Sequence, residues 1–193
     1  NNEYKNDSWQ ERGERVTDLL DGPEYNSAKR STFNAFYTSP IVMEGIYNAL
    51  AHMGVPDTGV RALEPGCGIG NFLGMAPEKW EMVGVEKELI SAKIASQIYP
   101  QHTIYTNDFQ SSKLRSNQFH VVIGNVPFGK VSIQYNGCKL PLHNFFFAKS
   151  IELTAPGGIL ALITSRYTMD AKDTFFREYM SQRTRFIGAM RFW

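Results

Sequence analysis

The spacing of apolar residues changes along the chain, and this pattern predicts alternating helices and strands. From Pro40 to Met53 the apolar residues recur at helical spacing, and Gly54 provides a natural stop. Beyond this point short apolar runs alternate with helical segments, the first of which begins near Asn71. The expected strands are 60–63, 82–85, 103–105, 119–124, 158–164 and 186–191, and the other expected helices are 89–98, 144–153 and 173–181. This rhythm predicts an α/β fold of Rossmann-like type, with a mainly parallel, doubly wound sheet.

The polar N-terminal segment contrasts with the rest of the chain. Residues 1–30 are rich in charge, with a helical pattern over 9–20 and a turn at 21–23, and we interpret them as a lead-in segment on the surface. The 193 residues, 42% of them hydrophobic, suit one well-buried domain, which we place at 31–193. The chain starts without Met and ends inside an apolar run at 190–193, so we expect both ends to be cuts in a longer protein. The long irregular piece 129–143 is expected to be a functional loop.

Charge and cysteine content exclude several classes of function. The net charge of +1 argues against a surface that is basic throughout, although a local basic groove remains compatible with it. The two cysteines, Cys67 and Cys138, form no disulfide framework and have no metal-ligand spacing, which favours a reducing, cytosolic setting and no metal. Apolar runs fall short of the roughly 18 residues of a membrane span, so no membrane partner is expected.

A glycine loop after the first expected strand is a candidate cofactor site. Glu64 precedes Gly66, Gly68 and Gly70, and the absence of Cβ atoms in such a loop lets the backbone approach a ligand closely. The third glycine of a nicotinamide fingerprint would fall at Asn71, so this spacing disfavours NAD. The loop suits an adenosyl cofactor instead.

Acidic residues at the ends of the next two strands support this interpretation. Glu86 follows Gly66 by 20 residues, the spacing at which a carboxylate usually meets ribose hydroxyls. Asp108 can accept from an adenine amino group, and Phe109 beside it can pack on the ring. Each carboxylate alone is equally well explained as a helix cap or a solvated loop charge.

The most specific sequence feature is the run from Gly124 to Gly129 at the end of a buried strand. The Asn125 side-chain oxygen and the Val126 carbonyl can accept both hydrogens of an exocyclic amino group, while Pro127 shapes the turn and Phe128 stacks on the ring. The lone pair of an amino group on such a ring is delocalised, and two such acceptors favour the tetrahedral nitrogen needed for methyl transfer. No covalent intermediate is required.

These motifs resemble those of the amino-group (N6-adenine) DNA methyltransferases, whose catalytic motif reads Asp/Asn/Ser-Pro-Pro-Tyr/Phe. The segment Ala35-Phe36-Tyr37-Thr38-Ser39-Pro40 is similar to the family segment beside the methionine end of the cofactor, which implies cofactor roles for Tyr37 and Thr38. The motif order matches the γ arrangement. The amino-acid sequences of residues 30–38 and 124–129 look closest to methylase portions of large methylase–helicase proteins of bacterial mobile elements. Val126 departs from the family by replacing the first Pro, which keeps the carbonyl and loses the stiffness.

The resemblance covers roughly 28–193 and implies several properties. These are the S-adenosylmethionine-dependent methyltransferase fold, S-adenosylmethionine as cofactor, DNA with a flipped adenine as substrate, a restriction-modification context, and further domains, including target recognition after Trp193.

Other interpretations remain open. Related enzymes with a similar loop methylate a protein glutamine or an RNA base, and a non-catalytic cofactor- or DNA-binding module is a further alternative. Lys130 and His143 are candidates for substrate contact, yet a solvated loop and a polar helix start explain them as well. Cys67 is expected to be a small packing residue.

Overall fold

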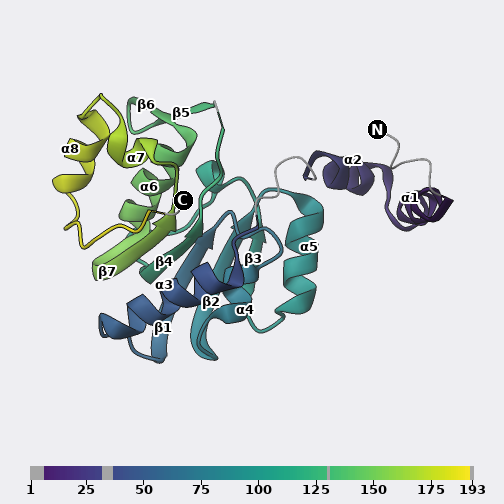
Figure 1. Cartoon of the computed structure of the whole chain (residues 1–193), viewed down its shortest axis with the longest axis horizontal. Helices are drawn as coiled ribbons and strands as arrows, with labels where there is room; N and C mark the ends of the chain where they lie inside the picture. Colours follow the sequence, from purple (N-terminus) through teal and green to yellow (C-terminus); the bar gives the residue numbers. More distant parts are fainter. Residues whose placement is uncertain (1–6, 32–36, 130, 192–193) are drawn as a thin grey trace.

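A parallel sheet of five strands forms the centre of the molecule (Figure 1). The computed structural model describes residues 7–31, 37–129 and 131–191. The strand order is β3-β2-β1-β4-β7, and a separate antiparallel hairpin pairs β5 with β6. The strands are β1 (Thr58–Pro65), β2 (Lys79–Glu86), β3 (Thr103–Thr106), β4 (Phe119–Asn125), β5 (Ser132–Tyr135), β6 (Cys138–Pro141) and β7 (Thr154–Ile163).

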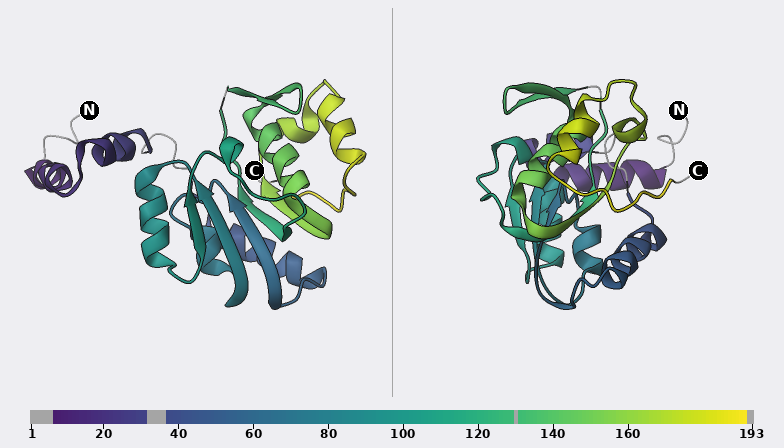
Figure 2. Two further views of the ribbon diagram at one scale, coloured as in Figure 1. Left: turned by 180° about the vertical axis from the view of Figure 1, so that it is seen from behind. Right: turned by 90° about the vertical axis from the view of Figure 1, so that its left-hand side faces the viewer.

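Helices lie on both faces of this sheet, as Figures 1 and 2 show from three directions. They are α1 (Asp7–Leu19), α2 (Gly22–Ser31), α3 (Pro40–His52), α4 (Asn71–Met75), α5 (Leu89–Ile98), α6 (Leu142–Leu153), α7 (Tyr167–Asp170) and α8 (Phe175–Ser181), with a 3-10 turn, η2, at Phe109–Ser111. The N-terminal α1 and α2 project beyond α5, and α2 packs on α5. Within the described residues, no helix combines the length and apolar character needed to cross a bilayer.

Two apolar cores explain why the strands read as continuous hydrophobic runs. One core joins strand residues such as Leu63 and Val122 to the aromatic face of α6, including Phe145. The other joins Ala62 and the alternate residues of the same strands to α3 and α4. Because neighbouring residues of a strand point to opposite faces, helices on both sides bury consecutive residues of the central strands β1, β2 and β4, whereas β3 and β7 at the sides of the sheet are only partly buried.

The strand order reverses between β1 and β4, and this places the site. In β1, Leu63 pairs with Val83 of β2 on one side and with Val122 of β4 on the other. The chain therefore leaves β1, β2 and β4 at one edge of the sheet, where doubly wound folds bind ligands at the reversal point.

Most of the expected elements are confirmed. The predicted helix 89–98 coincides with α5, and the predicted strands within β1, β2, β3, β4 and β7 are present, several of them longer than expected. The sheet is parallel and flanked by helices on both faces, as the pattern predicted.

The predicted last strand, 186–191, is wrong. The described part of that segment forms no strand, and Phe186, Ile187 and Met190 are about two-thirds exposed. An apolar run becomes a strand only when a neighbour takes up its backbone hydrogen bonds. Here the segment lacks a strand partner among the described residues, and an ion pair of 3.0 Å from Arg191 to Asp170 holds its end.

Candidate active site

A cavity of about 740 Å³ opens at the edge of the sheet where β1, β2 and β4 end. Its lining comes from the loop after β1, the ends of β2 and β3, the loop after β4, the β5–β6 hairpin and the start of α6. The volume lies within the range of about 300–1,000 Å³ that is usual for small-molecule sites. Most of the predicted site residues line it: Tyr37, Thr38, Glu64, Gly66, Gly68, Glu86, Asp108, Phe109, Asn125, Val126, Pro127 and Phe128.

The glycine loop bends through left-handed backbone conformations to form one wall. Gly66 has a φ of 71° and Gly68 a φ of 55°, values that side-chain-bearing residues rarely adopt. The amides of Gly66 and Cys67 both donate to the carbonyl of Val85, at 2.7 and 3.0 Å, which ties the loop to β2. The loop backbone thus lies open to the cavity without intervening side chains at the glycines.

Gly70, predicted as part of the same binding loop, is not among the residues that line the cavity. Its φ is 88°, and a Cβ there would lie 2.7 Å from the ring of Tyr99. This glycine therefore permits the start of α4 to pack closely against the end of α5.

Glu86 lies at the end of β2 and holds the glycine loop through a hydrogen bond. One carboxylate oxygen accepts from the Gly68 amide at 2.8 Å, and the other from the Glu88 amide at 2.7 Å. Each oxygen keeps a second lone pair, so the group can also accept from a ligand hydroxyl. Burial raises the pKa of Glu86 above its ordinary value, while the hydrogen bonds from the backbone partly offset this effect.

Glu64 is a fully buried carboxyl beside the same cavity. Its Oε2 atom has no hydrogen-bond partner in the described structure, and its side chain is 3% exposed. Burial raises the pKa of Glu64 well above the ordinary value, and the negative charge of Glu86 raises it further. The Leu73 amide donates to this carboxyl group, which partly offsets the rise. A buried carboxylate oxygen that lacks a partner is costly, and a cation bound in the cavity would offset that cost.

Asp108 and Phe109 occupy the turn after β3, as predicted, and both have partners within the protein. Asp108 accepts from Lys87 at 2.6 Å and caps η2 through the Gln110 amide at 2.9 Å. Burial raises the pKa of Asp108, but these two donors outweigh it, and the net shift is downward. Phe109 is buried, its ring centroid lies 4.9 Å from that of Phe146, and both residues line the cavity.

The Asn125 amide has a fixed orientation. Its Nδ2 donates to Thr38 Oγ1 at 3.2 Å, joining the segment before α3 to the end of β4. Its Oδ1 is buried and has no hydrogen-bond partner among the described residues. Because a buried carbonyl oxygen without a hydrogen bond is costly, such an oxygen in a cavity wall favours binding of a ligand that donates a hydrogen bond.

Val126 shows how this chain accommodates its departure from the family motif. Its side chain is 1% exposed, and its backbone amide donates to the Ile163 carbonyl of β7 at 3.1 Å. Proline has no amide hydrogen and could not make this bond. The valine therefore exchanges the stiffness of a ring for a hydrogen bond to the neighbouring strand.

The segment after the motif is not the irregular loop that we expected from residues 129–143. Most of its described part forms the β5–β6 hairpin, and Val131, Ile133 and Leu142 line the cavity beside Phe128. The Leu142 amide donates to the Val131 carbonyl at 2.9 Å and closes the base of the hairpin. Alternating polar and apolar residues around Asn136-Gly137 carried this signal, since Asn-Gly favours tight hairpin turns.

Lys149 is a structural feature of the site that the sequence interpretation missed. It is 6% exposed, and its Nζ donates to the carbonyls of Phe109, Gln110 at 3.0 Å and Ser112 at 3.1 Å. Burial lowers the pKa of Lys149, while neighbouring carboxylates counteract the shift. This cation anchors the turn that carries Asp108. A lone lysine within the apolar run of α6 was the available signal.

The remaining candidates are resolved in different ways. His143 is half-buried at the start of α6 but is not among the cavity-lining residues, and burial lowers its pKa. Lys130 lies outside the described residues. Cys67 is a buried packing residue, as predicted, and burial raises the pKa of its thiol.

Comparison with solved structures identifies the fold. A class I S-adenosylmethionine-dependent methyltransferase of Listeria monocytogenes, described as putative, matches with a TM-score of 0.60 and 17% identity, over 74% of this chain and 50% of the other. A putative sarcosine dimethylglycine methyltransferase of Galdieria sulphuraria matches with a TM-score of 0.53 and 14% identity, over 74% and 59%. The chain thus spans between half and three-fifths of the length of these structures. Its fold is that of the S-adenosylmethionine-dependent methyltransferases.

The sequence itself defines the family. The model of the Eco57I restriction-modification methylase matches residues 77–192, more than half of the chain. The protein belongs to the Eco57I restriction-modification methylase family. No curated protein sequence matches the chain. S-adenosylmethionine is the cofactor that this fold and this family use, in agreement with the expectation from the glycine loop.

Proposed function

We propose that the chain is the catalytic domain of a DNA methyltransferase that transfers a methyl group from S-adenosylmethionine to the N6 amino group of a flipped adenine. The observation that carries this proposal is the buried Oδ1 of Asn125, which has no partner among the described residues and lies in the wall of the same cavity as the glycine loop. An acceptor held in this way recognises an N–H donor. An exocyclic amino group supplies that donor and also the nitrogen to be methylated.

The residues of the cavity divide into a cofactor half and a substrate half. Glu86 would accept from ribose hydroxyls, the backbone at Gly66 and Gly68 would lie against the cofactor, and Asp108 with Phe109 would hold the adenine of the cofactor. The buried, unpaired oxygen of Glu64 fits a ligand that carries positive charge. S-adenosylmethionine bound there supplies a methyl group activated by a sulfonium.

The substrate half acts through orientation and hydrogen bonding. Thr38 holds the Asn125 amide so that its oxygen, and not its nitrogen, remains available to the substrate. Asn125 Oδ1 and the Val126 carbonyl would accept the two amino hydrogens and draw the nitrogen out of conjugation with the ring. Fixed acceptors of this kind can supply a large part of a rate enhancement because they need no reorganisation during the reaction.

The exposed aromatic ring of Phe128 would stack on the flipped base. It lines the cavity next to the motif and is 40% exposed. Stacking between a base and an aromatic side chain contributes about 1–3 kcal/mol. That contribution offsets part of the cost of removing an adenine from the duplex.

The finer assignments are also part of this proposal. The order of motifs along the chain, with Thr38 before the glycine loop and Asn125 after it, supports the γ arrangement. The amino-acid sequences of the motifs support the proposal that this catalytic domain is joined to a helicase in a protein of a mobile element. We also propose a boundary near residue 31 between the lead-in helices and the catalytic domain, and a target-recognition domain supplied by further parts of the protein.

Identification of the methylated product tests the proposal. The chain is incubated with labelled S-adenosylmethionine and, in parallel, with duplex DNA, RNA and glutamine-containing peptides, and the digested products are analysed by mass spectrometry. We expect N6-methyladenine from DNA. Methylated glutamine or RNA with unmodified DNA would contradict the DNA assignment and favour the corresponding alternative.

A further inference from the structure

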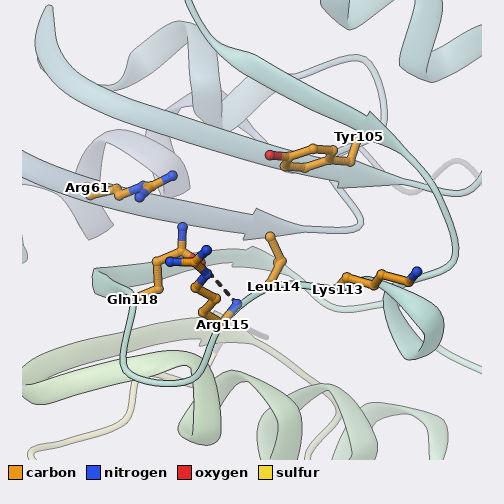
Figure 3. Close-up of a pocket in the computed structure, with 6 residues that line it drawn as sticks. All are labelled: Arg61, Tyr105, Lys113, Leu114, Arg115 and Gln118. Atoms are coloured by element: carbon orange, nitrogen blue, oxygen red, sulfur yellow. Dashed lines mark hydrogen bonds between the residues drawn. The ribbon is translucent and has the colours of Figure 1, made fainter.

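A second pocket, with a volume of about 380 Å³, lies apart from the cavity described above. Figure 3 shows the six residues that line it: Arg61, Tyr105, Lys113, Leu114, Arg115 and Gln118. None of them lines the larger cavity. Three of the six are cations that the proposed methyl transfer does not use.

Arg61 reaches the pocket from β1 with its guanidinium held in place. Its Nε lies 3.1 Å from a carboxylate oxygen of Glu81, and the guanidinium carbon lies 5.6 Å from the centre of the Phe119 ring. Glu81 contacts the Nε atom, and the Phe119 ring lies against the face of the guanidinium. The two terminal nitrogens retain the forked geometry that matches a phosphate.

Lys113 and Arg115 come from the connection between η2 and β4. Both are exposed, and neither takes part in an ion pair within the described chain. The Arg115 amide donates to Gln118 Oε1 at 3.1 Å, drawn as the dashed line in Figure 3, which fixes the turn between them. The Gln118 amide nitrogen therefore remains as a further donor toward the pocket.

Tyr105 completes the opposite wall. It projects from β3, is 45% exposed, and lies across the pocket from Leu114 in Figure 3. Its hydroxyl is a hydrogen-bond donor, and its ring offers an apolar surface beside the cations. This combination of cations, hydroxyl and aromatic surface is typical of contacts to phosphate and sugar.

The local charge contrasts with that of the whole chain. The protein carries 20 basic and 19 acidic residues, whereas this pocket is lined by three cations and by no carboxylate. Glu81 is paired with Arg61, and Glu152 accepts from the Ser116 hydroxyl beside Arg115. Lys113 and Arg115 have no ion-pair partner among the described residues, so both remain available to attract a bound anion.

We propose that this pocket binds a phosphate of the DNA backbone at a position separate from the flipped base. The choice of DNA rests on the proposed function. Lys113, Arg115 and Tyr105 are exposed around the rim, so the pocket suits a phosphate within a strand that runs along the surface. The same chain segment contributes to both sites, since residues 107–109 line the active-site cavity and 113–115 line the pocket.

The test compares two double variants with the same loss of charge. Lys113→Ala/Arg115→Ala removes two of the three cations of the pocket, and Lys172→Ala/Arg185→Ala removes two exposed cations outside both cavities. Binding of labelled duplex DNA by the 193-residue chain is measured by fluorescence anisotropy over a series of salt concentrations. Inorganic phosphate is titrated separately to detect a site for the free anion.

We expect the pocket variant to weaken DNA binding roughly 10-fold or more at about 0.1 M salt and to lower the salt slope by about 0.9 for each lost phosphate contact. The control variant should change neither quantity. Equal effects of both variants, no effect of the pocket variant, or no DNA binding by the unmodified chain would overturn the proposal. Binding of inorganic phosphate at the pocket with unchanged DNA affinity would overturn the assignment of this pocket to a DNA phosphate.

Failure here can be distinguished from failure of the proposed function. Calorimetric binding of S-adenosylmethionine and the methylated product are measured with the same variants. A pocket that is not used for DNA leaves both of them unchanged, whereas a wrong functional assignment shows in the product even if the pocket binds phosphate.

Discussion

Replacing Glu86 by Ala tests how the cofactor half is built. The carboxylate accepts from the amides of Gly68 and Glu88 at 2.8 and 2.7 Å, and each oxygen keeps one lone pair for a ribose hydroxyl. A hydrogen bond to a charged acceptor is worth about 1.5–3 kcal/mol. Loss of one such bond to the cofactor therefore raises Kd roughly 10- to 150-fold. Two lost bonds would raise it further.

The same substitution leaves two loop amides without their acceptor, so the loop itself loosens. Thermal unfolding without ligand measures this structural part, and calorimetric titration of S-adenosylmethionine measures the loss of binding. Glu44→Ala, at an exposed position of α3, is the matched control and should change neither. An unchanged Kd in Glu86→Ala would refute the assignment of this carboxylate to the ribose.

Three further predictions concern pH, an anchor and the motif. Burial raises the pKa of Glu64 above its ordinary 4.5, so the contribution of this group to the stability of the ligand-free protein is fully present below 4.5 and is lost as pH rises through the raised pKa. A cationic ligand reverses the shift, so its binding should release protons, which calorimetry in buffers of different ionisation enthalpy detects. Equal heats in all buffers would contradict this. Lys149→Met leaves three carbonyls without their donor and should lower the free energy of unfolding by about 2–4 kcal/mol in denaturant titrations. The affinity for the cofactor should fall as well, and an unfolding free energy equal to that of the unmodified chain would contradict the anchoring role of Lys149. Val126→Pro loses the 3.1 Å hydrogen bond to the Ile163 carbonyl and should lower the free energy of unfolding by about 1–3 kcal/mol without changing the Kd for S-adenosylmethionine. A higher free energy of unfolding would show that the rigidity of the proline ring contributes more than this hydrogen bond.

The parts of the site that lie at strand ends could be predicted from the sequence. Apolar runs that end at a glycine loop, at Glu86 and at Asn125 place those residues at one edge of a parallel sheet, because every such strand ends on the same side. This argument needs only the order of residues along the chain. It brought together the glycine loop, Glu86, Asp108 and Asn125, which all line the cavity, without reference to any tertiary contact.

The parts that depend on packing between distant segments could not be predicted in this way. The bond between Asn125 and Thr38 joins residues 87 positions apart, and the bonds from Lys149 to η2 span about 40. Gly70 fits the loop pattern, but its conformation serves contact with Tyr99. The strand expected at 186–191 failed because an apolar pattern does not specify a neighbour for its backbone.

The rate of methyl transfer by Asn125→Ala is the most direct test of the central claim. Single-turnover transfer from S-adenosylmethionine to adenine in DNA is measured with the protein in excess, beside Asn48→Ala as an exposed control on α3. We predict that Asn125→Ala slows transfer by roughly 100-fold or more, the scale seen when one preorganised hydrogen-bonding group is removed from an active site, while binding of S-adenosylmethionine stays within about twofold. Transfer by Asn125→Ala at the rate of the unmodified chain would contradict the role of its unpaired oxygen, and with it the account of catalysis given above.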